Sequence, residues 1–191
     1  ALGYHRFWVS EHHGLPTIVG TAPEVLLAAI AARTTRIRIG SAGVMLPHYS
    51  ALKVAEQFRV LEALAPGRID LGLGRAPGAD MNAAIALAAD GHPKFERFPQ
   101  LLRTLTEALW NPDFRPRVGP VPAGRIPVWV LGTSPDSALL AAELGLPDYA
   151  ESVLKPLGSG PKIKVLRLRV LLTKGDFARA VDVYGQVLKL Q

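Results

Sequence analysis

Short runs of apolar residues alternate with longer amphipathic segments over most of the chain. Each run has the length of a buried strand, about four to eight residues. Helix-start signals follow the runs; in the clearest, Thr21 suits the N-cap, Pro23 the first turn and Glu24 the positive end of the helix dipole. The pattern predicts strands over 5–10, 36–46, 68–74 and 127–132, helices over 21–33, 50–64, 98–110 and 133–144, and a partly helical insertion over 81–96.

Near-continuous apolar strands that alternate with helices are typical of a parallel sheet covered by helices. The sequence therefore predicts an α/β fold. Two architectures fit this pattern, a doubly wound sheet and a (β/α)₈ barrel. Both place ligands at the carboxyl ends of their strands, so polar residues that follow a strand are the candidates for chemistry.

The first candidates are Glu11, His12 and His13, which end the strand 5–10. An imidazole exchanges protons near neutral pH, so a histidine here suits general acid–base chemistry. The alternatives are a structural histidine in the core and a metal site made by the three residues. Adjacent residues of an extended chain point in opposite directions and chelate one ion poorly, so we expect no metal.

Two further strands end in residues that suit a phosphorylated ring. Ala42 and Gly43 in the second strand offer either a wall without bulky side chains or simply tight packing. Arg75 follows the third strand and is either a phosphate ligand or an ordinary surface arginine.

The segment "GTSPDS", residues 132–137, joins the fourth strand to a helix. Thr133 or Ser134 can cap that helix, and Pro135 suits its first turn. Hydroxyls and free backbone N–H groups at a helix N-terminus bind anions, although an ordinary cap has the same sequence.

The segments "EHH", "GSAGVMLP", "ALKVAEQFRVLEALAPGRIDLGLGR" and "VWVLGTSPDSALLAAELGLP" occur in this order over residues 1–150. In this arrangement the chain resembles the bacterial luciferase-like, flavin-dependent monooxygenase family. The resemblance implies a TIM barrel that uses reduced FMN and molecular oxygen. A subset of the family uses F420 instead, which we expect less here.

The resemblance also implies roles for single residues. His12 matches the family's catalytic histidine, which we expect to manage protons, and His13 matches the neighbour of that residue. The match places Ala42 and Gly43 against the isoalloxazine ring, and the flavin phosphate at Arg75, Thr133, Ser134 and Ser137. The chain departs from luciferase at Thr133, where luciferase has an acid, and at Gly74, where luciferase has a reactive cysteine.

The composition removes several alternatives. None of the 191 residues is cysteine, which excludes disulfides and thiolate chemistry, and no apolar run is long enough to span a membrane. The net charge is +6, but the 22 Lys and Arg are scattered, so we expect no nucleic-acid binding. The charge suits anionic ligands such as phosphate-bearing cofactors. We expect a cytoplasmic protein.

A TIM barrel takes about 250 residues, and this chain offers only four clear strands. We therefore expect a partial luciferase-like barrel over 1–157, truncated at both ends. Residues 158–191 are expected to form a linker and a helical tail. The tail fits either one amphipathic helix or a single tetratricopeptide-type helix pair.

The expected function is a flavin-dependent monooxygenase that acts on a small organic substrate, with a flavin reductase supplying reduced FMN. The alternative is a catalytically inactive remnant that binds flavin or a partner. The family resemblance further implies a homodimer that forms through the helices 21–33 and 50–64.

Overall fold

The chain divides into two compact units, Ala1–Leu131 and Gly132–Gln191, which are described separately. The expected boundary after residue 157 and the expected tail lie outside the described residues. The computed structural model describes residues 4–15, 20–75, 78–88, 90–131 and 135–146.

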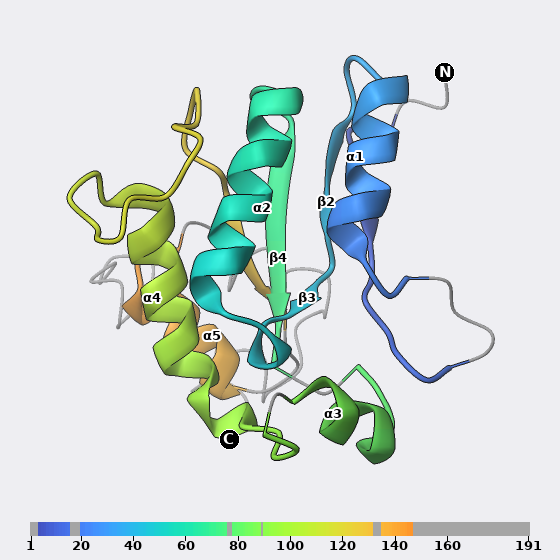
Figure 1. Ribbon diagram of the computed structural model, residues 1–191. Coiled ribbons are helices and arrows are strands. Elements are labelled where there is room, and N and C mark those ends of the chain that lie inside the picture. Colours follow the sequence, from blue (N-terminus) through green and yellow to red (C-terminus); the bar gives the residue numbers. More distant parts are fainter. Residues whose placement is uncertain (1–3, 16–19, 76–77, 89, 132–134, 147–191) are drawn as a thin grey trace, which may run out of the picture. The chain divides into compact units, whose positions relative to one another are not determined.

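A parallel sheet forms the centre of the first unit (Figure 1). β4 pairs with β2 and β3 on one edge and with β5 on the other, and β1 pairs with β2. When β2 and β3 are counted as two parts of one strand beside β4, the neighbours follow the order of the chain. A doubly wound sheet reverses its strand order, so this order is that of a barrel segment. The strands are β1 (Arg6–Val9), β2 (Arg38–Ser41), β3 (Val44–Met45), β4 (Ile69–Gly74) and β5 (Val128–Leu131).

The predicted strand 36–46 forms two separate strands. β2 and β3 are interrupted at Ala42 and Gly43, and the peptide bond between these two residues is cis. The backbone N–H of Ala42 donates to the carbonyl of Val9, 2.7 Å away, so the interruption stays tied to β1.

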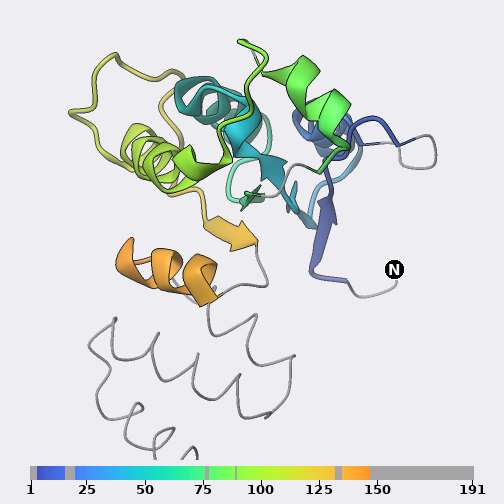
Figure 2. The same cartoon turned by 90° about the horizontal axis from the view of Figure 1, so that it is seen from below.

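The helices of the first unit lie together on one side of the strands (Figure 2). α1 and α4 both pack against α2, and Phe58 of α2 is fully buried in the core between helices and sheet. The predicted cap at Thr21 is wrong: Ala22 occupies the N-cap of α1 without a side-chain hydrogen bond. The helices are α1 (Pro23–Arg33), α2 (Ala51–Leu64), α3 (Met81–Leu87) and α4 (Phe98–Trp110), with α5 (Pro135–Glu143) in the second unit.

The strand face away from these helices carries a buried ion-pair network. The carboxylate of Asp70 in β4 is fully buried and accepts hydrogen bonds from Arg38 Nη2 at 2.6 Å and from Trp8 Nε1 at 3.2 Å. Arg6 Nε donates to the same carboxylate at 3.2 Å, but its side chain is 48% exposed. The ring of Trp8 lies 5.3 Å from that of Trp129 in β5, so residues from strands at both edges of the sheet meet on this face.

Asp70→Ala is expected to lower the free energy of unfolding by about 3 kcal/mol or more, because it leaves the charge of Arg38 without a carboxylate and the indole N–H of Trp8 without its acceptor. Urea unfolding of the full chain measures this loss. The control is Arg6→Ala, which removes a half-exposed partner and should cost less than about 1 kcal/mol. Equal losses of stability in the two variants would contradict the prediction that Asp70 is the main stabilising residue of this ion-pair network.

Candidate functional site

The loops that follow β1 and β4 are joined where these strands end. The backbone N–H of His13 donates to the carbonyl of Gly78 at 2.9 Å, and His13 forms an isolated parallel bridge with Ala79. α3 lies at the same end of the unit, the end toward which β4 points (Figure 1). The carboxyl ends of the strands therefore meet in one place, as the sequence predicts.

Glu11 is the centre of this site. Its side chain is fully buried, and its Oε1 lies 2.8 Å from Nε2 of His13 and accepts a hydrogen bond from the hydroxyl of Tyr49 at 2.7 Å. Oε2 accepts from the backbone N–H of Met45 at 3.0 Å. A buried charge is tolerated when donors surround it, and these donors let Glu11 remain a carboxylate.

The hydrogen bonds of Glu11 fix the state of its neighbours. A carboxylate only accepts, so His13 keeps a proton on Nε2 and a neutral His13 has its lone pair on Nδ1. Burial raises the pKa of Tyr49 above its ordinary value, and the hydrogen bond to Glu11 and the charges of Glu11 and Glu24 raise it further. Tyr49 therefore stays a neutral donor at physiological pH.

The imidazole of His13 is mostly buried, with 12% of its side chain exposed. Two further rings lie one after the other beside it. The ring of His48 lies 6.0 Å from that of His13, edge-on, and the ring of Phe95 lies 6.0 Å from that of His48 on a third segment. Because so little of the His13 side chain is exposed, its interaction with the Glu11 carboxylate is stronger than it would be in water.

The two histidines differ in their surroundings. The backbone N–H of His12 donates to the carbonyl of Gly20 at 2.8 Å, which ties the strand end to the chain ahead of α1. Its ring is half-buried and forms no hydrogen bond with any side chain in the described part of the protein. Glu11 and His13 are two residues apart and lie on the same side of the extended chain, so His13 receives the carboxylate.

Neighbouring strands leave no room for a side chain at Gly43. A Cβ atom there would lie 2.5 Å from Cδ1 of Leu131 and 2.8 Å from the backbone of Gly72. Gly43 is buried, whereas Ala42 is partly exposed, so Ala42 is the member of the pair with a surface to offer.

The remaining predicted phosphate ligands lie on different parts of the chain. Arg75 directly follows β4 and is exposed, with no ion pair or hydrogen bond to the other described residues. Ser137 is buried in α5 of the second unit. Thr133 and Ser134 lie outside the described residues, so the structure does not test the predicted grouping of these side chains.

Sequence reasoning missed Tyr49 and the N–H of Met45, and it placed Glu11 at the site without giving it a role other than that of a possible metal ligand. The available signal was the segment "PHYS", which places two polar aromatic residues after the predicted strand 36–46. Polar aromatic residues after a parallel strand belong to the same class of candidates as the "EHH" segment.

The described residues contain no cluster of three or more His, Asp or Glu side chains suited to a metal ion. Glu11 and His13 supply two possible ligands, whereas protein zinc sites use three or four. Among the helices described, none is both long and apolar enough to cross a membrane.

Comparison with curated proteins gives relatives of high similarity. The chain is 48% identical over 154 residues to an N-acetyl-S-alkylcysteine monooxygenase of Bacillus subtilis, a match that covers 75% of this chain and 45% of the relative. The chain spans less than half the length of this relative and of others that it matches at 49% and 53% identity.

Solved structures give the same fold. The crystal structure of apo-MsnO8 matches with a TM-score of 0.70 and 42% identity, over 80% of this chain and 49% of that one. The FMN complex of the oxygenating constituent of 3,6-diketocamphane monooxygenase from Pseudomonas putida matches with a TM-score of 0.66 and 20% identity, over 91% of this chain and 53% of that one. An F420-dependent secondary alcohol dehydrogenase matches with a TM-score of 0.57 and 18% identity, over 74% and 47% of the two chains.

The family model matches most of the chain, residues 1–157. This match begins ahead of β1 and includes the segments that carry Glu11, His13, Tyr49 and Arg75. The sequence resemblance is thereby confirmed, and the chain belongs to the luciferase-like monooxygenase family.

Proposed function

We propose that the protein is a flavin-dependent monooxygenase acting on a small organic substrate. The observation that carries the proposal is the buried Glu11 carboxylate, which orients the imidazole of His13 at the carboxyl ends of the strands. A histidine held in this way is suited to control protons in a reaction. A buried carboxylate–imidazole pair at this end of a barrel is typical of chemistry rather than of packing.

We propose FMN as the cofactor, in preference to F420. An exposed guanidinium at the end of β4 suits a phosphate, and the described residues leave Arg75 free to bind one. Further ligands in the proposal are Thr133, Ser134 and Ser137 for the phosphate and Ala42 and Gly43 for the ring. Structures of the same fold with FMN and with F420 support a flavin-type cofactor for this architecture.

A bound reduced flavin would supply the electrons that activate molecular oxygen. The residues of the chain then have separate tasks. Nδ1 of His13 accepts or returns a proton, while Glu11 holds the ring through Nε2 and Tyr49 donates to the same carboxylate oxygen. His12, the other histidine of the proposed pair, has a half-buried ring that a substrate or cofactor can approach.

The proposed partners are a flavin reductase, a small substrate and oxygen. The Bacillus subtilis relative suggests an N-acetyl-S-alkylcysteine as a substrate to test first. The alternative is an inactive remnant that binds flavin or a partner. The two proposals differ in turnover, because only an enzyme oxygenates a substrate when reduced flavin is supplied.

We also propose a homodimer that forms through α1 and α2. The two helices border an open groove of about 340 Å³, lined by both apolar and charged residues. Val25, Val60 and Leu64 expose 65%, 47% and 62% of their surface there, which is unusual for large apolar residues without a partner. Lys53 and Glu56 flank the groove and suit a polar rim.

Arg75→Ala is expected to weaken FMN binding by about tenfold or more, because a charged hydrogen bond to the phosphate is lost. Fluorescence titration of the full chain with FMN measures the Kd. Arg33→Ala removes another exposed arginine at the end of α1 and should leave the Kd unchanged. Equal weakening in both variants would mean that Arg75 contributes only to the net positive charge and does not bind the phosphate directly.

His13→Ala is expected to lower the rate of substrate oxygenation by about a hundredfold or more while FMN binding is retained. Product formation from an N-acetyl-S-alkylcysteine, with NADH and a flavin reductase, measures the rate. Glu11→Gln and Tyr49→Phe should each cause a smaller loss, since the imidazole itself remains. His92→Ala, which changes an exposed histidine beside Asp90, is the control. Full activity of His13→Ala together with loss in His12→Ala would assign the proton step to the other histidine.

Val60→Asp is expected to convert the dimer into a monomer, because a buried unpaired charge at an interface is strongly unfavourable. Light scattering coupled to gel filtration measures the mass in solution. Ile85→Asp places the same charge on an exposed apolar position of α3 and should leave the mass unchanged. A wild-type chain that is monomeric at all concentrations would remove the proposed interface.

A further inference from the structure

A second hollow lies at the opposite end of the strands from Glu11 and His13. It has a volume of about 690 Å³ and lies between the last turn of α4, Arg59 of α2 and the loop 111–127 that leads into β5. In Figure 1 this loop lies where β4 begins, whereas α3 lies where β4 ends. The hollow is therefore separate from the proposed flavin site.

The walls of the hollow are mainly apolar. The buried side chains of Leu109 and Val118 form part of the lining, together with the rings of Trp110 and Phe114. Val121 lines it as well and is 86% exposed, although valine usually avoids such a position. These surfaces suit the apolar body of a small molecule.

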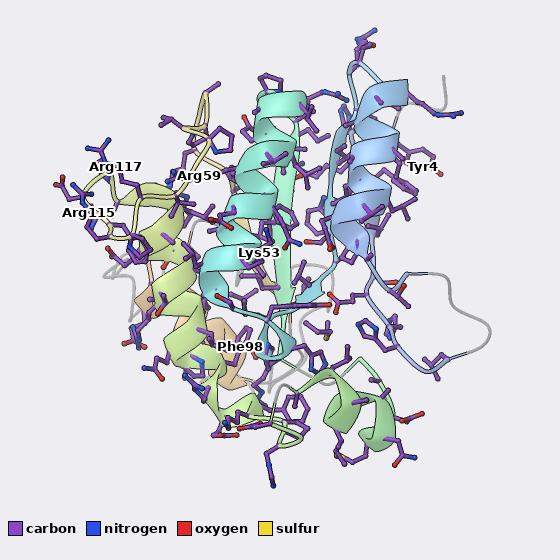
Figure 3. The ribbon with its side chains drawn as sticks, in the orientation of Figure 1. Tyr4, Lys53, Arg59, Phe98, Arg115 and Arg117 are labelled. Carbon is purple, nitrogen blue, oxygen red and sulfur yellow. The ribbon has the colours of Figure 1, made fainter. Side chains whose placement is uncertain are left out.

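Three arginines line the same hollow. Arg125 lies with its guanidinium carbon 3.9 Å from the ring centre of Trp110, and Arg117 comes from the middle of the loop. Figure 3 shows Arg117 and Arg59 around this loop. The guanidinium–ring contact holds Arg125 at the wall and lowers the entropy that binding would cost.

Arg59 carries the strongest indication of an anionic ligand. It is buried, and it donates to the carbonyls of Ala108 at 2.8 Å and Leu109 at 3.0 Å and to that of Val118. Its Nε–H is also buried but has no acceptor among the described residues. Carbonyl oxygens satisfy its donors without neutralising its charge.

No carboxylate of the described residues pairs with any of these arginines. The described ion pairs involve other residues, and Asp113, the acid of this loop, is exposed and forms no ion pair with the described residues. Burial lowers the pKa of Arg59, which means that its charged form lacks solvation. An anion in the hollow would supply the missing compensation.

We propose that this hollow binds a small organic carboxylate with an apolar body. Guanidinium groups and carboxylates form forked hydrogen bonds, and the apolar lining gives the remainder of the ligand a dry surface. Inorganic phosphate would use the charge but not the walls. The ligand expected is thus an aliphatic or aromatic acid of modest size.

Sodium octanoate titrated into the full chain tests the proposal by calorimetry. We expect saturable binding with a Kd below about 1 mM, and binding at least about tenfold weaker for neutral octanamide and for inorganic phosphate. The indole N–H signal of Trp110 should shift in nitrogen–proton spectra while that of Trp8 does not, because only Trp110 lines the hollow.

The variant Arg117→Gln with Arg125→Gln should weaken octanoate binding by about tenfold or more, because both exposed guanidinium groups are lost. Both side chains are exposed, so the fold should persist. Arg115→Gln is the matched control, since Arg115 belongs to the same loop but bonds to the carbonyls of Pro112 and Phe114 and does not line the hollow.

Several results would overturn the proposal. These are absence of saturable binding, equal affinity for octanoate and octanamide, equal weakening in the Arg115 control, and an unchanged Kd in the double variant. FMN affinity should be the same in the double variant and the wild type. The test therefore separates failure of this proposal from failure of the proposed flavin site.

Discussion

The pairing of β4 on both of its edges is the constraint from which the rest of the first unit follows. All six residues of the strand are buried, and its neighbours run parallel to it. Parallel strands end at a common edge, so the loops after β1 and β4 must meet. The hydrogen bond between His13 and Gly78 joins them, and Glu11 adds a third segment through Met45 and Tyr49. A buried carboxylate of this kind fixes one arrangement of these segments, because any other leaves its charge without donors.

The two ends of the sheet carry buried side chains of opposite charge. At the carboxyl end a buried anion organises the site, and a neutral phenol and an imidazole surround it. At the amino end a buried cation, Arg59, ties the last turn of α4 to the loop before β5. Barrel folds place catalysis at the first end and stability at the second. Here the second end retains uncompensated positive charge beside an apolar hollow, which pure stability does not require.

The sequence predicted the helices and strands of the described units closely. The spacing of apolar residues and the Gly and Pro residues that end an element are both local signals in the sequence. The strand 68–74 corresponds to β4 and the helix 98–110 to α4, and the family assignment is confirmed. The sequence left barrel and doubly wound sheet open, since both share the same pattern and differ only in strand order. It missed the role of Glu11, because a carboxylate 34 residues before its donor in the chain, Met45, leaves no local pattern. The interruption at Ala42 and Gly43 was also missed, since the groups that crowd Gly43, Gly72 and Leu131, are distant in the sequence.

Gly43 has an effect beyond its own position. Its missing side chain is replaced by the terminal methyl of Leu131 and the main chain of Gly72. A methyl group at Gly43 would have to push Leu131 aside, and Leu131 is the last residue of β5. Variation in the middle of the sheet would thus be transmitted, by steric displacement alone, to a segment almost ninety residues away in the chain. Natural or engineered diversity at one of these positions should be accompanied by a compensating change in size at the other.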